Sequence, residues 1–123
     1  MSQSKKDIVQ KINDSFAAGS SDGFLEFCTD DITWKMVGEP EVKGKQAVRE
    51  FMASNGGMEP PKFTVDKIVA EGDSAVCWGD MTMGHDAYSY CDVYTFDGDK
   101  VRELRAFVVK HKSADAENKS ATA

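Results

Sequence analysis

A single carboxylate stands at the centre of an aromatic segment, YSYCDVYTF, at residues 88–96. Side chains alternate between the two faces of a β-strand, so Asp92 shares its face with four aromatic residues, Tyr88, Tyr90, Tyr94 and Phe96. A carboxylate among apolar groups is costly unless it is paired, hydrogen-bonded or protonated, and burial raises its pKa toward neutrality. Asp92 is therefore a candidate catalytic acid or base. The alternative is a structural carboxylate that a tyrosine hydroxyl or water satisfies.

A second aspartate, Asp80, lies in the preceding strand-like segment, SAVCWGDMTM, at residues 74–83. If residues 85–87 connect the two segments, the antiparallel register places Asp80 opposite Asp92, with their Cβ atoms about 5 Å apart. Two like charges repel at that distance, so one aspartate would keep its proton. The pair would then form a dyad in which one member acts as acid and the other as base. A one-residue bulge or slip would instead turn Asp80 outward.

The rest of the chain supplies the elements that position these aspartates. Apolar residues recur every four positions between a capping box at Ser4 and Gly19, which predicts a helix. Further helices are expected at residues 22–28 and 45–54, with a strand at 31–38 between them. From Lys62 onward the segments KFTVDKIVAE, SAVCWGDMTM, AYSYCDVYTF and VRELRAFVVKH all read as strands.

This order predicts one α+β domain over residues 1–112, in which helices cover one face of a bent antiparallel sheet. The tail at residues 113–123, SADAENKSATA, lacks large apolar residues and is expected to be disordered.

Composition limits the partners. The chain has 123 residues and a net charge of −6, whereas nucleic acids and anionic membranes attract basic surfaces, so neither is expected as a partner. No signal peptide or membrane span is visible. The odd number of cysteines, at residues 28, 77 and 91, suggests reduced thiols and a cytoplasmic protein. No metal-binding or cofactor-binding motif occurs, so neither a metal nor a cofactor is expected.

The order of elements, together with four sequence segments, resembles the nuclear-transport-factor-2-like superfamily, in particular its SnoaL-like and ketosteroid-isomerase-like branch. The segments are AAGSSDGFLEFCTDDITW, KGKQAVREFM, EGDSAVCWGDMTM and YCDVYTFDGDKVRELRAF. The resemblance implies a sheet curled into a cone around an apolar pocket, wrapped by three N-terminal helices, and a homodimer formed through the outer sheet face. Mapped onto that cone, the residues expected to line the pocket are Trp34, Met36, Trp78, Tyr88, Tyr90, Tyr94, Leu104, Ala106 and Val108.

The catalytic residues of the related enzymes carry over only in part. Asp92 matches the acid that ketosteroid isomerases carry on this strand, but Ile12 stands where they have a tyrosine and Met36 where they have the proton-shuttling base. Steroid isomerisation by the known mechanism is therefore not expected. Limonene-epoxide-hydrolase-like proteins use an arginine-x-aspartate motif and a second aspartate. Here Asp80 keeps the first aspartate of that set, and Ala106 replaces the second.

The resemblance implies a protein that binds a small apolar cyclic or polyketide-like molecule. Cofactor-independent isomerisation, cyclisation or hydrolysis by Asp92 and Asp80 would follow if it is an enzyme. One alternative is a ligand-binding protein without chemistry, which Ile12 and Met36 favour. Another is a protein-interaction module, which an exposed apolar groove outside the dimer interface would favour.

Overall fold

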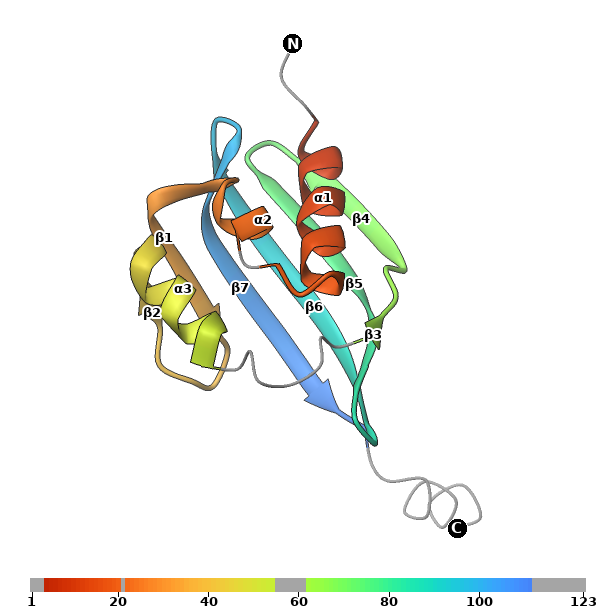
Figure 1. Ribbon diagram of the computed structural model, residues 1–123. Coiled ribbons are helices and arrows are strands. Elements are labelled where there is room, and N and C mark those ends of the chain that lie inside the picture. The colour runs from red at the N-terminus through yellow and green to blue at the C-terminus, as the bar shows by residue number, and fades with distance from the viewer. Residues whose placement is uncertain (1–3, 21, 55–61, 112–123) are drawn as a thin grey trace.

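The computed structural model describes residues 4–20, 22–54 and 62–111, and Figure 1 shows its helices lying on one face of a curved sheet. The helices are α1 (Lys5–Ala17), α2 (Asp22–Leu25) and α3 (Lys45–Ser54). The strands are β1 (Cys28–Met36), β2 (Val42–Lys43), β3 (Lys62–Phe63), β4 (Lys67–Glu71), β5 (Ser74–Met83), β6 (Asp86–Asp97) and β7 (Lys100–Lys110). The expected tail at 113–123 and the domain boundary at 112 lie outside the described residues.

The sheet has the strand order β2-β1-β7-β6-β5-β3, and β4 also pairs with β5. The predicted α+β fold is confirmed, with two corrections. The first strand, β1, runs parallel to the last strand, β7, although the other pairings are antiparallel. The strand expected over residues 62–71 is divided into β3 and β4, because the backbone between them bends while still bonding to β5.

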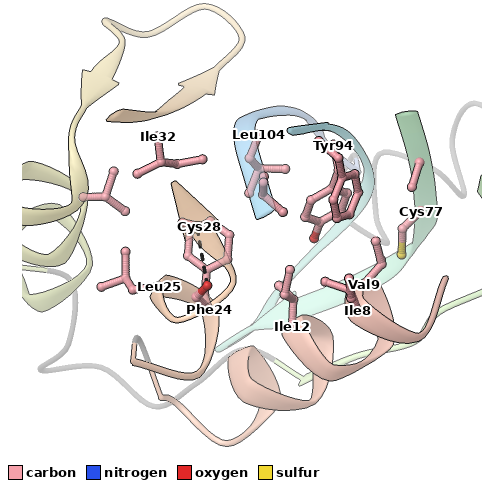
Figure 2. Close-up of a cluster of buried hydrophobic side chains, with 14 of the residues drawn as sticks. Ile8, Val9, Ile12, Phe24, Leu25, Cys28, Ile32, Cys77, Tyr94 and Leu104 are labelled. Carbon is pink, nitrogen blue, oxygen red and sulfur yellow. Dashed lines mark hydrogen bonds between the residues drawn. The ribbon is translucent and has the colours of Figure 1, made fainter. Parts of the chain in front are cut away.

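Helix α1 begins where its sequence predicts. The Ser4 side chain accepts a hydrogen bond from the backbone N–H of Asp7 at 3.1 Å, which satisfies one of the free N–H groups at the helix start. Ile8, Val9 and Ile12 are then at most 2% exposed. Figure 2 shows these three side chains directed from α1 toward Tyr94 and Leu104 of the sheet. The buried core therefore lies between the helices and this sheet face, which we call the inner face.

The two faces of the sheet differ in composition. On β6 the predicted face does point inward: Tyr90, Tyr94 and Phe96 are between 0 and 7% exposed. The register across β1, β7 and β6 adds Trp34, Met36, Leu104 and Ala106 to the inner face. The opposite, outer face carries charged residues and several exposed apolar ones. No helix among the described residues is long and apolar enough to cross a membrane.

Candidate functional site

The hairpin between β5 and β6 sets which aspartates share a face. Its turn has two residues, Gly84 and His85, since Met83 pairs directly with Asp86. Gly84 has a φ of 63°, a conformation that glycine adopts without steric cost and that tight hairpin turns use. The predicted three-residue connection is therefore wrong. The true register differs by three residues, because Asp80 pairs with Ser89 rather than with Asp92.

This odd shift turns the opposite face of β5 inward. Ala75, Cys77 and Gly79 face the helices, whereas Asp80 and Trp78 lie on the outer face, where Trp78 is 37% exposed. The predicted dyad of Asp80 and Asp92 is therefore wrong, and so is the expectation that Trp78 lines the inner face.

Asp80 instead belongs to a hydrogen-bonded chain on the outer face. Ser89 Oγ donates to Asp80 Oδ1 at 2.8 Å and lies 2.7 Å from His111 Nε2. Because the serine has one proton, this arrangement has the histidine N–H donating to Ser89 while Ser89 donates to the carboxylate. These hydrogen bonds hold the end of β7 against the β5–β6 hairpin. The backbone N–H of His111 also donates to the carbonyl oxygen of Ala87 at 2.8 Å.

Asp92 lies on the inner face between two small side chains. Its partner on β5 is Cys77, and its partner on β7 is Ala106, which in turn pairs with Met36 of β1. The two neighbours across the sheet therefore add little bulk beside the carboxyl group. Asp92 itself is half-buried, so it lies at the boundary between the closed core and solvent.

The environment of Asp92 favours its protonated form. Burial raises its pKa from 3.8 to about 7, and no charged partner opposes this shift. Among the described residues no side chain or backbone group donates a hydrogen bond to its carboxylate. Such an acid is partly protonated at neutral pH and can both give and accept a proton. Burial, followed by the nearby Asp92 carboxylate, also raises the pKa of Tyr94.

A polar group missed by the sequence analysis lies beside Cys77, the register partner of Asp92. Asn13 of α1 is 2% exposed, and its Nδ2 donates to Cys77 Sγ at 3.2 Å. Cys77 Sγ is 4.0 Å from the hydroxyl of Tyr90, which donates to the carbonyl oxygen of Thr64 at 2.6 Å. Asn13 follows Val9 by four residues, so its place on the apolar stripe of α1 was a signal that could have identified it.

Exposure along the inner face changes at the level of Asp92. Tyr94 and Leu104, on the side toward α2, are 0 and 1% exposed. Met36, Tyr88 and Val108 are only half-buried although they also face inward. The inner face is therefore more exposed on the Met36 side than beside Tyr94 and Leu104. The predicted lining residues, apart from Trp78, all lie on this face: Trp34, Met36, Tyr88, Tyr90, Tyr94, Leu104, Ala106 and Val108.

Positions 12 and 36, where ketosteroid isomerases carry a tyrosine and a base, hold no proton-transfer group in this protein. Ile12 is fully buried in the core, and Met36 has a thioether that cannot shuttle protons. Within the described ranges, no group of three or more His, Cys, Asp or Glu side chains could hold a metal ion. Asp92 thus lies on the inner face of β6 without a charged partner, whereas Asp86, on the same face at the hairpin end of β6, is exposed and lies 3.5 Å from Lys110 Nζ.

Comparison with known proteins identifies the fold. The SnoaL-like domain family matches residues 9–104, whereas no curated protein matches the sequence significantly. A candidate ketosteroid isomerase from Kribbella flavida superposes with a TM-score of 0.77 at 15% identity, covering 89% of this chain and 80% of that one. A candidate SnoaL-like polyketide cyclase from Jannaschia has a TM-score of 0.75 at 18% identity, covering 88% and 90%.

An epoxide hydrolase of the limonene-epoxide-hydrolase-like type from M. tuberculosis is also similar. Its TM-score is 0.74 at 15% identity, covering 85% of this chain and 82% of that one. Other similar structures are NTF2-like proteins of unknown function. These similarities establish a shared NTF2-like fold, on which different chemistries have been built.

Proposed function

Because this chain belongs to the SnoaL-like domain family, we propose that it binds a small apolar cyclic or polyketide-like molecule against the inner face of the sheet and exchanges protons with it through Asp92. The molecule enters from the Met36 side, where inward residues are half-buried. Met36, Ala106 and Val108 offer it an apolar surface. Asn13 and Cys77 offer a polar one on the other side of Asp92.

The observation that carries the proposal is an inward carboxyl group with a pKa of about 7 and no charged partner. A single group of this kind can remove a proton from a carbon next to a carbonyl and return it to another atom of the same molecule. Isomerisation and aldol-type cyclisation need only this step. Hydrolysis by two carboxylates is less well supported, since Asp80 faces outward and Ala106 replaces the second aspartate.

A ligand-binding protein without chemistry is the second candidate. Two positions that support proton transfer in related isomerases carry Ile12 and Met36 here. Neither side chain can donate a proton or stabilise a developing negative charge. In this case Asp92 serves only to orient a polar group of the ligand.

Hydrogen exchange at carbon distinguishes the two candidates without knowledge of the product. The bicyclic ketone 1-tetralone is incubated with the protein in D2O, and deuterium uptake next to the carbonyl is followed by NMR. Proton transfer by Asp92 accelerates uptake, and Asp92→Asn should reduce the acceleration by about 10²- to 10⁴-fold. Asp80→Asn is the matched control and should exchange at the wild-type rate, because Asp80 lies on the outer face.

The outcomes separate the candidates. Binding of 1-tetralone without accelerated exchange would favour the binding protein. Equal acceleration by the wild type and by Asp92→Asn would show that Asp92 is not the base.

A further inference from the structure

Two hydrogen-bond donors on the inner face have no partner among the described residues. The Tyr94 hydroxyl and the Trp34 Nε1 atom are both buried from solvent and unpaired. Tyr94 as a whole is 0% exposed. Figure 2 shows its side chain reaching from the sheet toward α1, with its hydroxyl in the space between the two layers. Tyrosine and tryptophan usually find a partner for these groups when they are buried.

The register places both donors in one row across the sheet. Trp34 of β1 pairs with Leu104 of β7, and Leu104 pairs with Tyr94 of β6. The neighbouring row is Met36, Ala106 and Asp92. Two residues along a strand separate the rows by about 7 Å. Tyr94 and Asp92 are therefore close enough for one small molecule to meet both, while Trp34 lies two strands, about 10 Å, from Tyr94 on the same face.

We propose that Tyr94, with Trp34 as a second donor, hydrogen-bonds an acceptor oxygen at the buried end of the ligand. This inference rests on the proposed function and adds the class of ligand. The ligand is an apolar ring compound that carries a carbonyl, ether or similar acceptor oxygen, with its apolar body over Met36 and Ala106. Tyr94 and Trp34 are thus specificity-determining residues, which select an oxygenated ring compound over the hydrocarbon of the same shape.

The two unpaired donors affect the stability of the free protein. A buried donor without a partner lowers stability, because its hydration is lost and nothing replaces it. A phenylalanine at position 94 would keep the packing and remove that penalty. A tyrosine that lowers the stability of the free protein is explained if its hydroxyl is used when the ligand is bound.

The same strand provides a matched control. The Tyr90 hydroxyl, on the same face, donates to the Thr64 carbonyl oxygen at 2.6 Å. Removing it by Tyr90→Phe deletes a hydrogen bond that is already made. The two Tyr→Phe substitutions should therefore change the melting temperature in opposite directions.

The test has two readouts. Without ligand, Tyr94→Phe should raise the melting temperature by about 4 °C, and Tyr90→Phe should lower it by a similar amount. Binding of 1-tetralone and of tetralin, the hydrocarbon with the same ring skeleton, is then measured by calorimetry. The ratio of the two dissociation constants measures the preference for the oxygen. Tyr94→Phe should reduce this ratio roughly 3- to 10-fold and Trp34→Phe should also reduce it, whereas Asp80→Asn, on the outer face, should leave it unchanged.

The results distinguish this inference from the proposed function. If both compounds bind and Tyr94→Phe leaves the ratio unchanged, the inference is overturned while binding at the inner face stands. A fall in melting temperature for Tyr94→Phe overturns it as well, because the hydroxyl would then already have a structural partner. An unchanged ratio in Trp34→Phe removes Trp34 from the site. If neither compound binds, the proposed function and this inference fail together.

Discussion

The hydroxyl of Tyr90 donates a 2.6 Å hydrogen bond to the backbone carbonyl oxygen of Thr64, across the inner face of β5. Gly79, the register partner of Tyr90, lies beneath this contact. A Cβ atom at position 79 would overlap the Thr64 carbonyl group and lie 3.1 Å from the Tyr90 hydroxyl. A side chain at position 79 and this hydrogen bond therefore exclude each other. The contact joins the bend between β3 and β4 to the wall beside Asp92.

Gly79→Ala should lower the free energy of unfolding by about 2 to 4 kcal/mol, because it forces the Thr64 carbonyl away and breaks the Tyr90 bond. Urea denaturation measures the change. Tyr90→Phe, which breaks the same bond without the steric overlap, should cost about 1 kcal/mol. The double variant should lose less stability than the sum of the two single losses, because the hydrogen bond that both changes break is lost only once. Unchanged stability of Gly79→Ala would contradict the close approach of Thr64.

The pKa of Asp92 predicts how stability depends on pH. The unfolded residue ionises near 3.8 and the folded one at about 7, so between these values the folded protein binds a proton that the unfolded chain has released. The contribution of Asp92 to stability therefore falls as the pH rises from about 4 to 7 and is constant above that range. Each tenfold difference in proton affinity costs about 1.4 kcal/mol, so ionising Asp92 in place costs several kcal/mol at most.

Asp92→Asn isolates this effect from that of other carboxylates. The variant should be more stable than the wild type at pH 8, by about 2 to 4 kcal/mol. The two proteins should converge near pH 4, where the wild-type aspartate is protonated when folded. Urea midpoints measured across this pH range give the comparison. A constant difference between the two proteins at every pH would mean that Asp92 titrates normally and faces water.

Local sequence patterns predicted the elements that have one clear apolar face. The alternation in β6 oriented Asp92 inward, and the Ser4 cap and the spacing of Ile8 and Ile12 defined α1. The face of β5 was wrong for a physical reason. It followed from the assumed connection at residues 85–87, whereas the actual turn at Gly84 and His85 shifts the register by three residues and turns small residues inward.

Three features of the candidate site depended on the fold rather than on any local pattern. The Thr64 carbonyl group lies against Gly79, so the segment between β3 and β4 contacts β5 there. This close approach explains why β5 has no side chain at that position of its inner face. The bond between Asn13 and Cys77 joins α1 to β5, and the unpaired Tyr94 hydroxyl becomes visible only when its neighbours are known. Contacts between distant segments have no signature in a single sequence, so Asp92 was predictable while its surroundings were not.

The outer face of the sheet carries four large apolar side chains that are exposed: Val69, Trp78, Phe107 and Val109. Trp78, Cys91 and Phe107 form a row across β5, β6 and β7. Trp78 and Phe107 are 37% and 41% exposed, and Val109 is 66% exposed. Exposed apolar patches of this kind mark interaction surfaces. We propose that a second copy of the chain covers this face, forming a homodimer.

Sedimentation should give a species of twice the 13.5 kDa chain mass for the wild type. Phe107→Asp should shift it to the mass of one chain, because it places a charge within an apolar contact. Lys11→Asp, on the exposed side of α1, is the control and should leave the dimer intact. In a two-fold dimer centred on this row, Cys91 lies near its counterpart, so a short thiol cross-linker should join the chains. A wild type that sediments as one chain would contradict the homodimer and leave the face free for a different partner.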